Sequence, residues 1–327
     1  MANLIDNTPA ALAWVKEALE ANRSNAYGEL VSAVLWTEQR NEQGILVVPA
    51  DPDVLVSKIN NSPLIVLHNH DPGKPVGQVL ESAKFRSEAG LFFVVAVLGY
   101  FSGGNGISFD SLNLDIDAPV SPPSSLPVLP DDFYIQVGVD PRDVEREWLD
   151  LVSSDCPVDI EFVELSHNAA ESSKELIIVA FPLLLLVWNP YVTAIATEAG
   201  KDTYHRIKSW LRKLFERLSD RKDPIVDIQS FHDGCEMSFI VRGARVQGHY
   251  VAHEKMADAA IRAARLIASL KRRGMPPRKL VYEFDQDGSI WYPSYALLKN
   301  NTIISRPSTL IAIEQLPKGL SLGLGRK

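Results

Sequence analysis

The sequence predicts an α+β protein, with an N-terminal, mainly β, compact barrel-like domain and a C-terminal mixed α/β domain. The chain has 327 residues, of which 46% are hydrophobic and 23% are charged, and this length accommodates two domains with separate cores. Five prolines fall among residues 118–130, where they cannot donate hydrogen bonds to a sheet. Short apolar strands dominate before this run, whereas helices and strands alternate after it.

We therefore expect a β-rich domain at residues 1–117, a Pro-rich linker at 118–130, and an α/β domain at 131–327. The balance of charge also changes at the linker. Residues 1–130 contain 7 basic and 14 acidic side chains, whereas residues 131–327 contain 26 and 27. The two parts of the chain therefore differ in their balance of charge, because acidic side chains are in clear excess only in the first.

The elements of the first domain follow from the spacing of its apolar residues. Leu12, Val15 and Leu19 recur at helical intervals, so residues 9–21 are predicted to form an amphipathic helix. Residues 51–60 are predicted to form a second, shorter helix. Apolar runs bounded by turn residues predict the strands of this domain, which are residues 29–36, 44–48, 64–67, 75–80, 90–98 and 107–116.

The second domain alternates strand and helix patterns. Pro141 suits the first turn of a helix, and Asp287-Gly288 is typical of a hairpin turn. The predicted elements are strands at 133–139, 158–163, 225–231 and 236–241, helices at 141–152, 202–218 and 253–271, and a closing hairpin around 284–291.

One apolar run, residues 176–188, is the only membrane-like segment of the sequence. It has thirteen residues, whereas a helix that spans a bilayer needs about 20. Pro182 interrupts it. We expect a buried element here, with membrane contact as the alternative because the run could extend to Thr197. The N-terminus has no basic and apolar leader pattern, so we expect a cytoplasmic protein.

The strongest local signal is the sequence His68-Asn-His-Asp71 at the end of the apolar strand 64–67. Two imidazoles and a carboxylate follow a rigid strand directly, and Gly and Pro turn residues come next. Catalytic and binding groups are often mounted in this way. The alternative is a set of solvated turn residues.

Three short stretches occur in order in this domain, namely His70-Asp71, Pro75-Val-Gly77 and Glu88-Ala-Gly-Leu-Phe92. Through these stretches, residues 27–117 resemble the prohead (capsid maturation) serine proteases of tailed bacteriophages. The resemblance implies a barrel like that of the herpesvirus assemblins. It also implies acyl transfer from a protein substrate to a serine that a histidine activates.

The resemblance assigns roles to particular residues. His70 matches the base, Ser108 in Gly106-Ile-Ser-Phe109 fits the nucleophile best, and Ser111 is the second choice. The family's third, acidic member has its nearest match in Glu164, beyond the linker. Either Glu164 belongs to the first domain or the third member is missing. Because Phe109-Asp110 follows Ser108 in place of small residues, a catalytically inactive relative is the alternative to an active peptidase.

A second interpretation of the same histidines is a metal-dependent hydrolase. In a strand, His68 and His70 would lie on one face, and Asp71 could complete a site for zinc or iron. JAMM-type metallo-isopeptidases begin with such a His-x-His but continue with a Ser-x-x-Asp pattern, which this sequence lacks. We therefore predict no metal site and no cofactor.

Residues 201–222 contain 8 basic and 3 acidic side chains, with Trp210 and Phe215 among them. Such a stretch could meet a membrane surface or an acidic partner, or it could be the solvated face of an amphipathic helix. A pI near 5.4 argues against nucleic acid as a partner of the whole chain. A non-catalytic scaffold that docks on a membrane or protein partner through residues 176–222 is therefore the alternative function.

The remaining chemistry-bearing residues are interpreted as structural. His249 and His253 could share a metal ion if both were helical, but Gly248 favours a loop at His249 and a surface pair. Cys156 and Cys235 are too few for a disulfide framework and are expected to be reduced, buried thiols.

Overall fold

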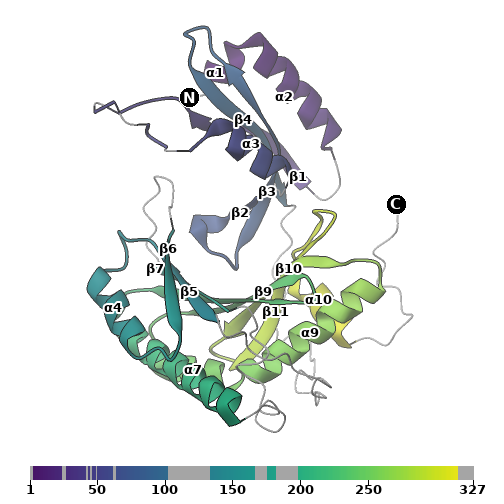
Figure 1. Ribbon diagram of the computed structural model, residues 1–327. Coiled ribbons are helices and arrows are strands. Elements are labelled where there is room, and N and C mark those ends of the chain that lie inside the picture. The colour runs from purple at the N-terminus through teal and green to yellow at the C-terminus, as the bar shows by residue number, and fades with distance from the viewer. Residues whose placement is uncertain are drawn as a thin grey trace. The chain divides into compact units, whose positions relative to one another are not determined.

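The computed structural model divides the chain into two units, Met1–Asn105 (unit 1) and Gly106–Lys327 (unit 2) (Figure 1). The described residues are 3–23, 27–41, 43–44, 46–48, 50–61, 64–101, 133–165, 175–181 and 198–315. The predicted linker, residues 118–130, lies outside them. Unit 1 has a four-stranded antiparallel sheet and unit 2 an eight-stranded mixed sheet with helices, which confirms the α+β class.

The sheet of unit 1 has the order β1-β4-β3-β2. Its long strands pair residues from different parts of the sequence, for example Val34 with Val95 and Ser82 with Ala96. The four described strands form an open sheet, with β1 and β2 at its edges. The strands are β1 (Tyr27–Thr37), β2 (Ile65–Leu67), β3 (Pro75–Arg86) and β4 (Phe92–Phe101).

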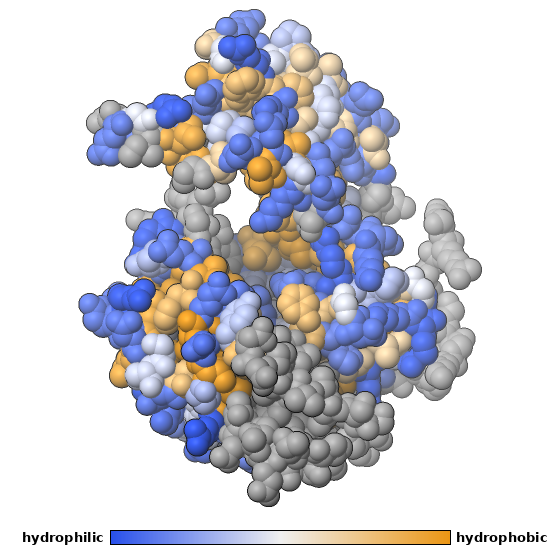
Figure 2. Space-filling model, in the orientation of Figure 1, coloured by the Kyte–Doolittle hydropathy of each residue, from blue (hydrophilic) through white to orange (hydrophobic). Residues whose placement is uncertain are grey.

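Helices cover both faces of this sheet. On one face, α1 (Asn3–Asp6) and α2 (Pro9–Ala21) contribute Ile5, Ala11 and Val15 to a cluster with Phe93 and Val95. On the other face, α3 (Pro52–Asn61) buries Ile59 against Val79, Ala96 and Leu98. Alternate residues of the central strand β4 therefore serve two separate small cores. Orange, hydrophobic residues lie among blue ones over α3 in Figure 2, where Val54 is 64% exposed.

Asn60, near the end of α3, pairs with β3 in the manner of a strand residue. Its side-chain amide accepts a hydrogen bond from the backbone N–H of Ser82 at 2.8 Å and donates one to the backbone C=O of Ser82 at 2.9 Å. Strand β2 has only three residues and pairs with β3 up to Gln78. The Asn60 amide therefore satisfies backbone groups of β3 beyond the end of β2.

Most elements of unit 1 match their predictions, with one error. The helices at 9–21 and 51–60 are confirmed by α2 and α3. Residues 44–48 were expected to form a strand, but the described ones make only an isolated bridge from Leu46 to Arg40. The predicted strand 107–116 lies outside the described residues.

The sheet of unit 2 has the order β12-β11-β10-β9-β8-β7-β5-β6. Three neighbouring pairs are parallel, namely β5 with β6, β7 with β8, and β9 with β10, and helices lie between the members of each pair in the sequence. The strands are β5 (Tyr134–Val139), β6 (Asp159–Glu164), β7 (Glu175–Ala180), β8 (Pro224–His232), β9 (Cys235–Arg242), β10 (Pro277–Asp285), β11 (Ile290–Leu298) and β12 (Ile303–Ile304).

The described helices of unit 2 all contribute to one hydrophobic cluster on one face of this sheet (Figure 1). In α7, Ile207, Leu211, Leu214 and Phe215 recur at helical spacing and are buried against it. The helices are α4 (Arg146–Ser154), α7 (Glu198–Arg217), α8 (Val246–Glu254), α9 (Met256–Arg272) and α10 (Pro307–Gln315), and the short 3₁₀ turn η3 (Leu218–Asp220) follows α7.

Two helix predictions in unit 2 were wrong in their boundaries. Pro141 does not begin a helix, because residues 141–144 form a turn that Asp140 closes, and α4 begins at Arg146. The helix predicted at 253–271 corresponds to α9, but its first two residues belong to α8, which was not predicted, and a break at Lys255 separates the two helices.

The apolar run at 176–188 begins as predicted with a buried element. Ile177 and Val179 of β7 are fully buried in the middle of the eight-stranded sheet. Residues 182–188 lie outside the described part of the chain. None of the helices that the structure describes has the length and apolar character needed to cross a bilayer.

Candidate functional site

The histidine motif predicted from the sequence forms a closed turn at the end of β2. The backbone N–H of His68 donates to the C=O of Lys74 at 2.9 Å, the N–H of Asp71 donates to the C=O of His68 at 3.0 Å, and the N–H of Lys74 donates to the C=O of Asp71 at 3.0 Å. Residues His68–His70 form a single 3₁₀ turn (η1). Backbone hydrogen bonds therefore fix the position of His70 relative to β2 and β3.

The carboxylate of Asp71 stabilises the same turn from within. Asp71 is 1% exposed, and its Oδ1 accepts a hydrogen bond from the N–H of Gly73 at 3.1 Å. Its Oδ2 lies 3.8 Å from Nζ of Lys74. Asn69 has a left-handed backbone, with φ 49°, a conformation that asparagine adopts more readily than most residues. Sequence and local geometry therefore agree on a tight turn here.

The structure places only some of the residues predicted to act together. The backbone of His70 is described, but its side chain is not. Ser108 and Ser111 lie outside the described residues. Glu164 is the last residue of β6, an edge strand of the unit 2 sheet, and its side chain is exposed. Glu164 therefore belongs to unit 2 and not to the sheet that positions His70.

The geometry assumed for the metal interpretation is not the one observed. His68 and His70 lie in a 3₁₀ turn, with left-handed Asn69 between them, and not in an extended strand that would place both rings on one face. Among the side chains that the structure describes, no three His, Cys, Asp or Glu residues cluster in a way that could hold a metal ion.

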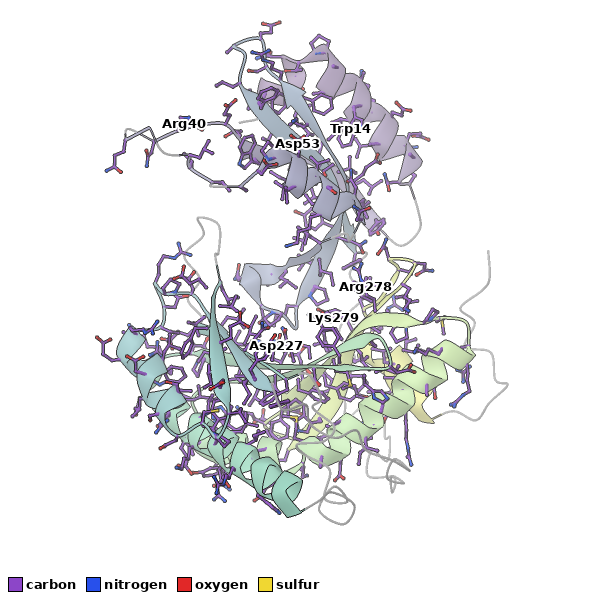
Figure 3. All side chains as sticks on the ribbon, in the orientation of Figure 1. Trp14, Arg40, Asp53, Asp227, Arg278 and Lys279 are labelled. Carbon is purple, nitrogen blue, oxygen red and sulfur yellow. The ribbon has the colours of Figure 1, made fainter. Side chains whose placement is uncertain are left out.

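A second cluster of polar residues, which the sequence reasoning missed, lies in unit 2. It occupies the face of the eight-stranded sheet opposite the helices, and we call it the polar face. Asp227 of β8 and Lys279 of β10 are labelled in Figure 3. The members are Asp227, Gln229, Glu236, Ser238, Arg242, Lys279, Glu283, Ser294 and Tyr295.

Hydrogen bonds connect the members of the polar face across neighbouring strands. The carboxylate of Asp227 accepts hydrogen bonds from the hydroxyl of Ser238 and, at 2.7 Å, from the amide of Gln229. Nζ of Lys279 lies 2.7 Å from Oε1 of Glu236. Glu283 pairs with Arg242. Buried charges of this kind are tolerated only when they are paired and hydrogen-bonded.

Burial changes the acid–base behaviour of the polar face. Desolvation raises the pKa of Asp227, which is 1% exposed, although Lys279 and two hydrogen bonds oppose that effect. Desolvation also raises the pKa of Tyr295. The phenol therefore stays protonated at neutral pH.

The sequence does contain a pattern that indicates the polar face, but this pattern is missed when only the apolar residues of each strand are considered. In β8, Asp227 and Gln229 alternate with Val226 and Ile228, which indicates one polar and one apolar face. The pattern in β10 is similar, with Lys279 and Glu283 on the polar side. Comparing the polar positions of β8 with those of β10 would have indicated that these residues share one face of the sheet.

The basic stretch 201–222 forms most of α7, and its Trp210 and Phe215 are not available to a partner. Trp210 is 1% exposed and Phe215 is fully buried. The indole N–H of Trp210 donates to the C=O of Val152 at 2.8 Å. On the outer face, Lys213 and Arg217 both pair with Asp155.

The histidine pair and Cys235 are buried, whereas Cys156, which was also expected to be buried, is only partly so. His249 and His253 both lie in α8 and are 1% and 4% exposed, so the prediction of a surface pair with His249 in a loop was wrong. Cys235 is fully buried, and desolvation raises its pKa to about 12, so its thiol is not a nucleophile. Desolvation likewise raises the pKa of the Cys156 thiol to about 11.

Comparisons with known proteins give no relative from which a function could be transferred. No family model, no curated protein and no solved structure matches this chain.

Proposed function

We propose that the N-terminal part of the chain, residues 1–117, is a serine peptidase in which His70 is the general base and Ser108, or alternatively Ser111, is the nucleophile. The observation that carries the proposal is the closed turn at 68–74. Backbone hydrogen bonds and the buried Asp71 carboxylate hold a histidine at the end of a sheet strand. A rigid mounting of this kind suits a group that must meet a hydroxyl at about 2.6–3.2 Å.

The chemistry would be acyl transfer in two steps. His70 takes the hydroxyl proton of the serine while the serine oxygen attacks the carbonyl carbon of a peptide bond. The C–N bond then breaks, and the amine leaves with the proton from His70. Water releases the acyl group by the same route.

A biotinylated fluorophosphonate, which labels activated serines, tests this proposal on the full chain. We expect labelling of the wild type, loss of labelling in Ser108→Ala, and at least a 100-fold slower reaction in His70→Gln, because an unassisted hydroxyl is a poor nucleophile. Mass spectrometry of the labelled peptide identifies the serine. Glu164→Gln tests the acidic member, and a rate equal to the wild type would exclude it.

Matched controls are available within the chain. His68→Gln changes the other histidine of the same turn, and Ser209→Ala changes an exposed serine of α7. Both should label at the wild-type rate. Absence of labelling at Ser108 and Ser111 in the wild type, or an equal loss in His68→Gln and His70→Gln, would refute the peptidase proposal.

A second candidate is a docking function of the outer face of α7. Lys208 and Arg212 are exposed there, while the apolar residues of the helix are buried in the core of unit 2. Contact with a partner would therefore be electrostatic. Lys208→Glu/Arg212→Glu should abolish flotation with phosphatidylserine vesicles in 50 mM salt, whereas Ser209→Ala should not. Wild-type protein that stays unbound would exclude a membrane as the partner.

A further inference from the structure

The buried histidines of α8 form a cluster that the proposed function does not use. Phe215 of α7 lies against both rings, with centroid distances of 5.7 Å to His249 and 6.0 Å to His253. His249 is 1% and His253 is 4% exposed. Two imidazoles and a phenyl ring therefore form the buried part of the contact between α7 and α8. At its exposed side, the Arg212 guanidinium lies 4.8 Å from the ring centroid of Tyr250.

The polar atoms of the two rings are in different situations. Nε2 of His253 lies 3.2 Å from the C=O of Lys208, and because a carbonyl only accepts, this nitrogen carries the hydrogen. Neither ring nitrogen of His249 has a hydrogen bond of good geometry in the described part of the chain, although backbone groups of Gly243, Phe215 and Arg242 lie close to the ring. Burying a neutral ring without such hydrogen bonds costs free energy, and burying a charged ring without them would cost far more.

The charged groups around the rings disfavour protonation further. Lys208 and Arg212 of α7 are the charged groups that act on His253, and both are cations. Glu216 of α7 is bonded to the hydroxyl of Tyr250 and lies 3.8 Å from Arg212. On the other elements packed here, Arg242 of β9 is paired with Glu283, and Lys255 bonds to the C=O of Ser289.

The two pKa values agree with this geometry. Desolvation, with Lys208 and Arg212, lowers the pKa of His253 to about 4. Desolvation also lowers the pKa of His249, although the backbone of Gly243, Phe215 and Arg242 opposes it. The same cationic surroundings disfavour a metal ion between the rings.

Few side chains of α8 are buried, although the C=O of Ala252 also accepts a hydrogen bond from the indole N–H of Trp291 at 2.9 Å. The buried residues of α8 are His249, Ala252 and His253, so two of three are histidines. The helix has nine residues and is separated from α9 by the break at Lys255. A short helix with few apolar anchors is a unit that can open locally.

We propose that the α7–α8 contact is an acid-sensitive latch, which is closed while His249 and His253 are neutral and opens when they take up protons. Opening moves the charged rings into water and away from Phe215, Lys208 and Arg212. The remainder of unit 2 stays folded, because α9 has nine buried side chains of its own.

Hydrogen exchange of the full chain, measured by mass spectrometry and corrected for intrinsic rates, tests the latch. The folded-state pKa of His253 lies below the unfolded value, so protection is complete above about pH 6.5 and is lost as the pH falls towards 4. Between pH 7.5 and 5.0, protection of residues 246–254 should fall about 30-fold for a shift from 6.5 to about 4. Residues 256–272 should keep their protection.

Variants separate the latch from a general loss of stability in acid. His253→Gln should reduce the acid response of α8, and His249→Leu/His253→Gln should abolish it. His205→Gln removes an exposed histidine of α7 and should behave as the wild type.

Results of two kinds, from hydrogen exchange and from NMR, would overturn the proposal. One is an equal acid response in wild type and the double variant, or an equal loss of protection in α8 and α9. The other, independent of any variant, is an NMR titration that gives His253 a pKa near 6.5.

Discussion

Arg221, directly after η3, connects three segments of unit 2 through one guanidinium group. Nη1 lies 2.7 Å from Oε2 of Glu145, and Nε lies 2.5 Å from Oε2 of Glu175. Nη2 donates to the C=O of Asp143, and the group lies 5.6 Å from the ring centroid of Trp148. The Arg221 side chain is 8% exposed and that of Glu175 is 16% exposed. Removing one partner of such a buried ion pair destabilises the protein, because the other charge stays buried without its partner.

We expect Arg221→Met to lower the free energy of unfolding of unit 2 by about 3 kcal/mol, because Glu175 would stay buried without its cation. Urea denaturation followed by circular dichroism measures the change. Arg146→Met is the matched control, since Arg146 pairs with Asp150 where both side chains are more than half exposed, and such pairs contribute little. Equal effects of the two substitutions would contradict this account.

At the scale of single residues, the sequence predicted the location of polar side chains at strand ends better than that of polar side chains within strands. His70 was expected directly after an apolar strand, and the structure has it in a turn that ends β2. Asp227 and Lys279 were missed, because each stands in the middle of a strand and their proximity depends on which strands become neighbours. That pairing is set by the whole sheet and not by local sequence.

At the scale of elements, regular apolar spacing was sufficient where an element is long and packs on one side. Residues 9–21, 202–218 and 225–231 were predicted close to their observed bounds for this reason. The break between α8 and α9 could not be predicted from spacing, because the apolar positions continue across Lys255 and no glycine or proline marks it.

The same limitation explains the misinterpreted histidines. Gly248 indicates a loop by its intrinsic helix propensity, yet it lies inside α8, where the side chain of Gln286 packs 3.2–3.4 Å from the position a Cβ would occupy. Close packing thus favours glycine at this point in the helix. His249 follows it into the helix and becomes buried, which tertiary packing decides and local propensity does not.

At the scale of the whole molecule, the two units have separate cores. Every buried residue of the large cluster belongs to unit 2, and the two smaller clusters belong to unit 1. A protein with independent cores is not expected to unfold in a single two-state transition.

Calorimetry should therefore resolve two transitions, each sensitive to substitutions in one unit. Val95→Ala should lower the free energy of unfolding of unit 1 by about 2 kcal/mol, because the side chain is fully buried. For the same reason, Leu211→Ala should lower the free energy of unfolding of unit 2 by about 3 kcal/mol. Each variant serves as the control for the other. A single transition that both substitutions shift would show that the units unfold together.

The hydrogen bonds between Asn60 and Ser82 have a consequence for how folded chains meet one another. Unpaired backbone groups at a sheet edge invite a strand from another molecule, which is a common route to aggregation. Beyond β2, the Asn60 amide already occupies both backbone groups of Ser82, and Lys84 and Arg86 follow in β3. A strand from another molecule would have to displace the Asn60 amide and approach two cations. This edge of β3 is therefore protected against pairing with strands of other molecules.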